Sequence, residues 1–238
     1  MMKAFLNWSG GKDSALCLYR AKQQGLSIEA LVTTVTQGTN RITMHGVRRA
    51  LLEQQAAALQ LPLYVLELPE QPGMAEYEAA IGNMNRQLKS EGFTHALSGD
   101  LFLEDLKTYR QQLYANENIE CLFPLWKSDT KELMHRFVRS GFKAILVCVN
   151  SALLDKSFCG RLLDESLIND LPANVDICGE NGEYHSFVFD GPVFLQPVPF
   201  TKGEIVFKEY PAPRRSKEKE NPAPSPSRTG FYFCDLLP

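Results

Sequence analysis

Short apolar runs alternate with helix-periodic segments through the first half of the chain. The run at residues 28–35 is continuous and rich in β-branched side chains, which is typical of a strand buried on both faces. Runs of this kind predict five strands, at residues 4–8, 28–35, 63–68, 94–98 and 119–123. The segments between them predict helices at 13–25, 46–60, 73–91 and 103–117. This alternation predicts an α/β fold with a parallel five-stranded sheet flanked by helices.

The pattern becomes richer in strands after residue 124. Helices are predicted at 130–140 and 160–170, and strands at 143–149, 186–189, 193–195 and 204–210. We therefore predict two domains, an α/β domain at residues 1–124 and a smaller α+β domain at residues 125–238. A cleft between two domains is a favoured position for a binding site.

The C-terminal part of the chain combines a polar, proline-rich stretch with an apolar end. Residues 211–229 contain five prolines and a run of charged side chains, and this composition predicts a mobile loop. The chain resumes with the apolar segment 231–237, which is predicted to return as a strand beside residues 204–210. The alternative is a tail that docks on another subunit of an oligomer.

Composition and charge describe a soluble globular chain. Its 238 residues are 44% hydrophobic and 22% charged, with a net charge of −3, so no overall basic field indicates nucleic acid as a partner. No apolar run approaches the roughly 18 residues of a membrane span, and no signal peptide precedes the first strand. The six cysteines are scattered without C-x-x-C spacing, which predicts reduced, mostly buried thiols in a cytoplasmic protein.

The sharpest motif ends the first predicted strand and opens the first predicted helix: Ser9-Gly10-Gly11-Lys12-Asp13-Ser14. Two glycines let the backbone turn its N–H groups toward an anion, and the helix N-terminus adds partial positive charge. Lys12 supplies a point charge for phosphate, and Ser14 either caps the helix or contacts the anion. The spacing differs from Walker A. An ordinary strand-to-helix turn is the alternative, and it explains fewer of these residues than a phosphate loop does.

Two shorter motifs also follow predicted strands. His45 and Gly46 precede a helix, where glycine permits close backbone approach and His45 could reach a phosphate or the adenosine. Gly99 and Asp100 follow a later strand, and Asp100 could hold Mg²⁺ through water. Ligands bind beyond the carboxyl ends of parallel strands, so we expect these loops to converge with the phosphate loop on one nucleotide site. A surface histidine and helix-capping carboxylates are the alternative interpretations.

A second dense motif lies between apolar segments of the second half: Cys178-Gly179-Glu180-Asn181-Gly182-Glu183-Tyr184-His185-Ser186. Asn-Gly among polar neighbours is a common hairpin signal, so a plain turn is the alternative. A plain turn needs neither Glu183 nor His185, and both lead into a strand that is predicted to be buried. The candidates for acid–base catalysis or for handling ammonia are Glu180, Asn181, Glu183 and His185.

Together these motifs resemble the diphthine–ammonia ligase family, within the PP-loop ATP pyrophosphatases, which have a Rossmann-like fold of the HUP type. The phosphate loop is typical of the whole superfamily, and the segment 179–187 is what makes the resemblance specific to this family. The resemblance spans nearly the whole chain and indicates the short, free-standing form.

The resemblance implies an AMP-forming carbon–nitrogen ligase. ATP would adenylate a carboxylate with release of pyrophosphate, and ammonia would displace AMP to leave an amide. In the authentic enzymes the carboxylate belongs to diphthine on elongation factor 2. Asp13 or Asp100 would position Mg²⁺, and Glu183 or His185 would deprotonate ammonium or orient ammonia. The residues that would bind ATP are Ser9, Gly10, Gly11, Lys12, Asp13, Ser14, His45, Gly46, Gly99 and Asp100.

Three other functions are compatible with the sequence. A bacterial relative would act on a different carboxylate, for instance in corrinoid salvage, because bacteria make no diphthine. A PP-loop enzyme that modifies tRNA is the second alternative, and the missing paired cysteines and the pI of about 5.9 count against it. The third is a nucleotide-binding protein without turnover.

Overall fold

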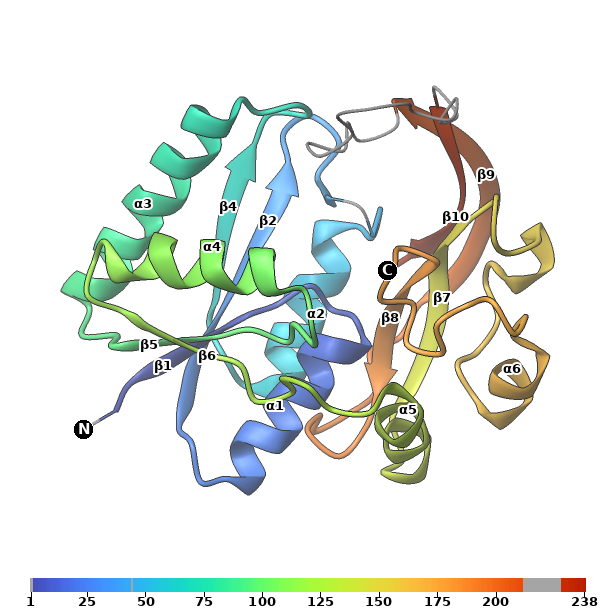
Figure 1. Cartoon of the computed structure of the whole chain (residues 1–238), viewed down its shortest axis with the longest axis horizontal. Coiled ribbons are helices and arrows are strands. Elements are labelled where there is room, and N and C mark those ends of the chain that lie inside the picture. The colour runs from blue at the N-terminus through green and yellow to red at the C-terminus, as the bar shows by residue number, and fades with distance from the viewer. Residues whose placement is uncertain (1, 44, 212–227) are drawn as a thin grey trace, which may run out of the picture.

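The computed structural model describes residues 2–43, 45–211 and 228–238 (Figure 1). Five parallel strands form its larger sheet, in the order β4-β2-β1-β5-β6. Their bounds are β1 (Ala4–Asn7), β2 (Ile28–Thr36), β4 (Leu63–Leu68), β5 (His95–Leu97) and β6 (Glu120–Leu122). All five predicted strands are present, so the predicted fold class is confirmed. A further strand, β3 (Arg41–Ile42), pairs antiparallel with the end of β2. The sequence does not predict β3, because two residues in a polar loop show no period.

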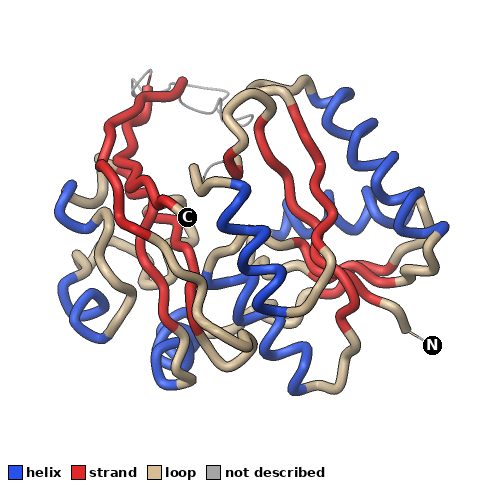
Figure 2. The backbone as a smooth tube through the Cα atoms, turned by 180° about the vertical axis from the view of Figure 1, so that it is seen from behind, coloured by secondary structure: helices blue, strands red, loops and turns tan. Residues whose placement is uncertain are grey.

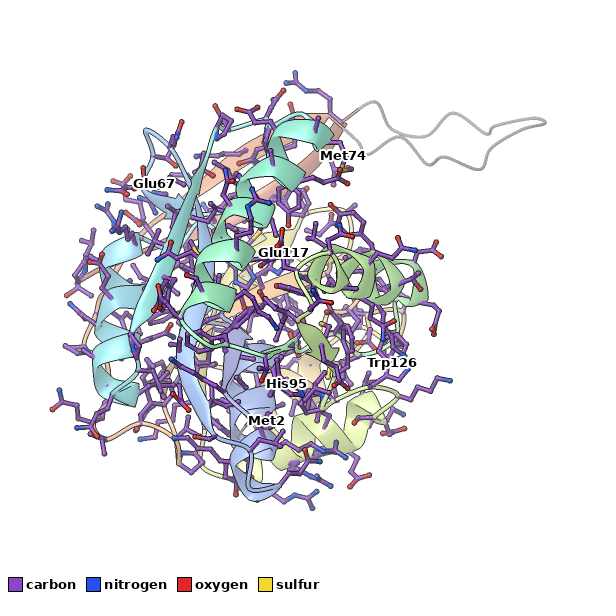
Figure 3. All side chains as sticks on the ribbon, turned by 90° about the vertical axis from the view of Figure 1, so that its left-hand side faces the viewer. Met2, Glu67, Met74, His95, Glu117 and Trp126 are labelled. Carbon is purple, nitrogen blue, oxygen red and sulfur yellow. The ribbon has the colours of Figure 1, made fainter. Side chains whose placement is uncertain are left out.

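Four helices cover the two faces of this sheet: α1 (Lys12–Gln23), α2 (Arg49–Leu59), α3 (Met74–Ser90) and α4 (Glu104–Ala115). On one face, Leu16 of α1 and Leu51 of α2 belong to the same buried cluster as Leu6 of β1. On the other face, Leu88 of α3 and Tyr114 of α4 pack with Phe5. Figure 3 looks at the α3–α4 face, where Glu117, just beyond α4, forms a 2.9 Å ion pair with Arg86 of α3. The sheet is therefore covered on both sides, as a parallel sheet requires.

A second sheet is antiparallel and has the strand order β8-β7-β10-β9 (Figure 2). Its strands are β7 (Lys143–Asn150), β8 (Tyr184–Asp190), β9 (Thr201–Pro211) and β10 (Arg228–Leu237). The prediction that residues 231–237 return beside 204–210 is confirmed, since Phe233 pairs with Val206. Most of the predicted mobile loop, residues 212–227, lies outside the described residues. The ends of that segment, Pro211 and Arg228, pair with each other in the ladder between β9 and β10.

The predicted strand at 193–195 is wrong. The Phe194 N–H donates to the Gly191 carbonyl at 3.0 Å, which closes a turn. Pro192, inside that turn, has no N–H to give to a ladder. Val193 is buried in the core without pairing to the sheet. Its apolar character therefore reflects packing and not strand formation.

Three short helical segments accompany the second sheet: α5 (Thr130–Arg139), a single 3-10 turn (Lys156–Phe158) and α6 (Glu165–Asp170). The predicted helix at 160–170 begins several residues too early. Asp164 caps the observed helix by accepting the Leu167 N–H at 2.9 Å, so the helix starts after it. None of the helices in the described part of the chain is long and apolar enough to cross a membrane.

The larger hydrophobic cluster extends from one sheet to the other. It contains Leu6 and Leu16 from the first half of the chain, and Leu146 and Phe187 from the second sheet. The division into domains at residues 124 and 125 stays a prediction. All six cysteines are free and buried, which confirms the expectation of buried, unpaired thiols.

Candidate active site

A cavity of about 550 Å³ lies at the carboxyl ends of the parallel strands, between the phosphate loop and the start of β8. Ligand pockets are typically of this size. The predicted site residues that line it are Ser9, Gly11, Lys12, Asp13, Ser14, His45, Gly99, Asp100, Glu180 and His185. Four others do not line it, namely Gly10, Gly46, Asn181 and Glu183. His45, Gly99 and Asp100 thus lie around one cavity with the phosphate loop, as predicted, and Glu180 and His185 of the segment 179–187 line the same cavity.

The phosphate loop (residues 9–14) requires its glycines. Gly10 has a φ of 75°, and a Cβ atom there would lie 2.7 Å from the side-chain oxygen of Gln55. A Cβ on Gly11 would lie 3.1 Å from both the His45 ring and the Ser186 carbonyl. No side chain of α1 caps its own N-terminus, whereas the Lys12 N–H donates to Ser186 Oγ at 3.1 Å. The loop and β8 are thus in direct contact.

Gln55 of α2 fastens the phosphate loop to β8. It is fully buried, and its Nε2 donates to the Gly10 carbonyl at 3.0 Å and to the Val188 carbonyl at 2.6 Å. Its Oε1 accepts the Trp8 indole N–H at 2.9 Å. The sequence does not reveal this residue, because a glutamine in a helix rich in Ala, Leu and Gln looks like a solvent-facing position.

Replacing Gln55 with leucine is expected to lower the free energy of unfolding by about 2–4 kcal/mol, because three buried partners would lose their hydrogen bonds. Urea unfolding followed by circular dichroism measures the loss. Gln54→Leu is the matched control on the same helix, since Gln54 makes no side-chain hydrogen bond with the described residues. Equal stability of the two variants would contradict the fastening role.

Lys12 is the central cation of the cavity. Its side chain is only 4% exposed, and its Nζ lies 2.7 Å from one oxygen of Asp13 and 3.6 Å from Glu180 Oε1. Burial lowers the pKa of Lys12, but the neighbouring carboxylates, Asp13 first, outweigh burial and hold that pKa above its ordinary value. Lys12 therefore stays charged at neutral pH. It links the phosphate loop to the segment that precedes β8.

Glu180 has the properties of a group that exchanges protons near neutral pH. Its side chain is 13% exposed and lines the cavity. Burial, followed by the charge of Asp13, raises the pKa of Glu180 to about 7, although Lys12 opposes the shift. A carboxyl group with a pKa near the working pH can both accept and return a proton.

Glu183 has a different environment from Glu180. It is 2% exposed, and its oxygens accept the Asp176 N–H at 2.9 Å and the Asn181 N–H at 2.8 Å. The side-chain amide of Asn181 also donates to it, at 3.1 Å. These bonds hold the turn that presents Glu180. Glu180 lines the cavity, whereas Glu183 and Asn181 do not. The catalytic roles of all three residues stay predictions.

The two histidines of the cavity lie against each other. The rings of His45 and His185 have centroids 4.5 Å apart and are tilted by 31°. Burial, and then the charge of Lys12, lowers the pKa of His185 to about 4. Burial and the neighbouring His185 place the pKa of His45 well below its ordinary value. Both imidazoles are therefore neutral at physiological pH.

The C-terminal strand holds the segment that carries His45. Gly46 has a φ of 70°, and a Cβ there would lie 2.9 Å from the Phe233 ring. Arg41 donates to the Gly46 carbonyl at 2.6 Å and to Asp235 at 2.8 Å, and Arg48 donates to Asp235 at 2.6 Å. Gly46 thus serves the packing of the loop. The sequence does not predict Asp235 as part of this arrangement, because its partners are almost two hundred residues away.

Asp235 is expected to contribute about 1–3 kcal/mol to stability at neutral pH, as charge-assisted hydrogen bonds do. Its bonds to Arg48 and Arg41 hold the pKa of Asp235 far below its ordinary value. The folded-state pKa is therefore depressed, and this contribution is present above the unfolded pKa of about 3.9 and lost as the pH falls below it.

The difference in unfolding free energy between the wild type and Asp235→Asn should accordingly be largest at pH 7 and should decrease steadily as the pH is lowered below about 4, with part of it still present at pH 3, because Asp235 stays ionised in the folded state well below its unfolded pKa. Asp190→Asn serves as the control, because Asp190 forms a 2.8 Å ion pair with Lys143 at the same side-chain exposure of 22%. A difference that does not change with pH would contradict the assignment.

Asp13 and Asp100, the two carboxylates predicted to hold magnesium, both line the cavity, and each lies beside a cationic side chain. Asp13 contacts Lys12, and Asp100 lies 2.9 Å from the Arg110 Nε. The described residues contain no cluster of three side chains suited to a metal ion. Mg²⁺ needs only one or two carboxylates when phosphate oxygens complete its shell, so magnesium at Asp13 or Asp100 stays a prediction.

Two further lining residues carry buried polar atoms that have no hydrogen-bond partner among the described residues. They are the Thr33 hydroxyl on β2 and the Asn85 amide nitrogen on α3. Buried polar atoms are normally bonded, so these two indicate a place for a polar ligand. Sequence reasoning missed both, because threonine is ordinary in a strand and asparagine gives no periodic signal in a helix.

The fold and the site define an α/β protein with a candidate active site at the carboxyl edge of a parallel sheet. Residues 2–116 match the family model described as the diphthamide synthase N-terminal domain, and residues 129–212 match the one for its C-terminal domain. The chain belongs to the diphthamide synthase family.

Curated relatives agree with this assignment. The chain is 27% identical to the diphthine–ammonia ligase of Danio rerio, with 83% of this chain and 86% of the relative aligned. It is 24% identical to the human enzyme of the same name, with 83% and 82% aligned. The relative from Schizosaccharomyces pombe is 27% identical, but the aligned part is only 36% of that longer chain. The predicted family and the predicted enzyme class, a carbon–nitrogen ligase, are confirmed.

Proposed function

We propose that the protein uses ATP to adenylate a carboxylate and then amidates it with ammonia, releasing AMP and pyrophosphate. The observation that carries this proposal is the position of Lys12 of the phosphate loop, whose Nζ lies 3.6 Å from Glu180 Oε1, with both residues lining one cavity. Diphthine on elongation factor 2 is the acceptor that we propose, since the relatives are named for diphthine and ammonia.

In this proposal, ATP occupies the cavity from the phosphate loop outward. The first turn of α1 and Lys12 would hold the phosphates, because an N-terminal helix turn and a buried cation both favour an anion. The adenosine would lie toward α3, where the side chains of Tyr77 and Met84 line the cavity. The free hydroxyl of Thr33 and the free amide of Asn85 would supply its polar contacts.

The first chemical step joins the acceptor to the nucleotide. A carboxylate oxygen forms a bond to the α-phosphorus, the bond from that phosphorus to the bridging oxygen breaks, and pyrophosphate leaves with the electron pair. Lys12 would stabilise the charge that develops on the leaving group, since preorganised cations act most strongly in a buried site. Its present partners, Asp13 and Glu180, keep this cation in place.

The second step transfers the acyl group to nitrogen. The nitrogen of ammonia bonds to the acyl carbon, the bond from that carbon to the AMP oxygen breaks, and AMP leaves. The nitrogen then loses one proton, and Glu180 is the group that we propose accepts it, because its pKa of about 7 lies near the working pH. Asp13 or Asp100 would hold Mg²⁺ on the phosphates, so chelation with EDTA should stop turnover and added magnesium should restore it.

The proposal is tested by identifying the nucleotide products. The protein is incubated with ATP, magnesium, ammonium and diphthine-bearing elongation factor 2, with reactions that omit ammonium or the acceptor as controls. AMP and pyrophosphate are expected, together with one amide per AMP. Formation of ADP and inorganic phosphate would exclude the adenylation mechanism.

A further inference from the structure

We propose that the neighbouring rings of His45 and His185 form the ammonia-binding site and that they hold ammonia as the uncharged molecule. This inference rests on the proposed function, in which ammonia attacks an acyl group above the phosphate loop. It assigns to the pair a task separate from that of Glu180. The histidines position the nucleophile, and the carboxylate receives the proton.

The geometry of the pair suits a small ligand with both donor and acceptor character. The two rings come from different parts of the chain, one beside Gly46 and one from β8, and both line the cavity with Lys12. His45 Nδ1 is buried and has no hydrogen-bond partner among the described residues. A neutral imidazole has one nitrogen that donates and one that accepts. An accepting nitrogen can bind an N–H of ammonia and leave the ammonia lone pair free to attack.

The charge of Lys12 acts on both histidines and disfavours an ammonium ion beside them. The charged side chains that line the same cavity are Lys12, Asp13, Asp100, Arg110 and Glu180. Burial and Lys12 disfavour the protonated form of His185, whose pKa falls to about 4. An ammonium ion beside His185 carries the same charge as imidazolium. Burial and the charge of Lys12 therefore disfavour ammonium there as well, relative to uncharged ammonia. Only the deprotonated form has a lone pair with which to form the new carbon–nitrogen bond.

The same charges make the histidines poor proton acceptors for the reaction. His185, with a pKa near 4, is a weak base at neutral pH, so it would not keep a proton taken from the attacking nitrogen. Glu180, with a pKa near 7, retains one more readily. When the amide forms, the excess proton on nitrogen therefore passes to Glu180 and the histidines remain neutral.

Nuclear magnetic resonance of the histidine ring protons tests the site without any acceptor. The chain has four histidines, at positions 45, 95, 135 and 185, and single His→Gln variants assign their signals. Titration with ammonium chloride at pH 8 should shift the signals of His45 and His185 saturably, whereas His95 and His135 should not respond. Potassium chloride at equal ionic strength is the control. Equal shifts with both salts, or no saturable shift at His45 and His185, would overturn the proposal.

Steady-state kinetics provides an independent readout. His185→Gln should raise the KM for ammonium about tenfold or more, while the dissociation constant of ATP stays within about twofold. His135→Gln is the control, because His135 lies on α5 and its ring contacts Glu165. A KM for ammonium that is unchanged in His45→Gln and in His185→Gln would also overturn it. Failure of the wild type to form AMP and pyrophosphate would instead refute the proposed function, which the ring-proton titration does not depend on.

Discussion

Replacing Lys12 with alanine is expected to lower ATP affinity about 100-fold and to reduce turnover by a further factor of about 10²–10³. Lys12 is the buried cation at the start of α1, and its removal leaves Asp13 and Glu180 without their shared counter-charge. The phosphates of ATP would then approach two carboxylates in a buried site. Turnover falls further because the charge that develops on the leaving pyrophosphate is no longer stabilised by Lys12. Calorimetric titration with ATP measures the first effect, and the rate of AMP formation measures the second.

Lys22→Ala is the matched control for this experiment. Lys22 lies on the same helix but is exposed to solvent, so its removal changes the net charge equally without altering the cavity. Its ATP affinity and turnover should remain within about twofold of the wild type, as is usual for an exposed charge. Retention of wild-type ATP affinity in Lys12→Ala would show that the phosphates bind elsewhere.

Replacing Glu180 with glutamine is expected to lower kcat about 10²–10⁴-fold, the usual contribution of a general acid–base group. Glutamine preserves the shape of the side chain but cannot take up a proton from the attacking nitrogen. ATP should still bind within about threefold of its wild-type affinity, because the phosphates are held by Lys12 and by the helix N-terminus. Single-turnover kinetics, together with ATP titration, separates the two effects.

Glu183→Gln should behave differently, although the substitution is chemically the same. Both Glu183 oxygens accept N–H groups, so the new NH₂ would face a donor in a buried position. The expected result is a loss of about 2–4 kcal/mol in unfolding free energy, with activity reduced as the turn loses its shape. If Glu183→Gln were as stable as the wild type but inactive, and Glu180→Gln were active, the acid–base group would be Glu183 and not Glu180.

The contrast between these two glutamates shows what a linear motif can and cannot reveal. The density of polar residues at 179–186 predicts a functional segment, and the segment does face the phosphate loop. Which carboxylate points into the cavity depends on the fold of the turn. That turn is set by Asp176 and Asn181, whose backbone N–H groups bind Glu183 and leave Glu180 to contact Lys12. The sequence order of the two glutamates does not contain this information.

The parallel sheet was predictable for a simple physical reason. Strands buried on both faces are rich in apolar and β-branched side chains, as β2 is apart from the exposed Glu29, and the helices between them show a periodic apolar face. Apolar character alone is ambiguous where a segment packs without pairing, as Val193 does. The individual side-chain hydrogen bonds between distant segments were not predictable. Gln55, which joins the phosphate loop to β8, and Asp235, which holds Arg41 and Arg48, act on partners that no local pattern indicates.

The fate of the acceptor's carboxylate oxygen shows whether that carboxylate is adenylated. The acceptor is prepared with heavy oxygen in its carboxylate, and the products of one turnover are analysed by mass spectrometry. If the acceptor is adenylated in the cavity that Lys12 and Glu180 line, we expect one heavy oxygen in AMP, one in the amide and none in pyrophosphate. Heavy oxygen in inorganic phosphate, or AMP without the label, would contradict the account.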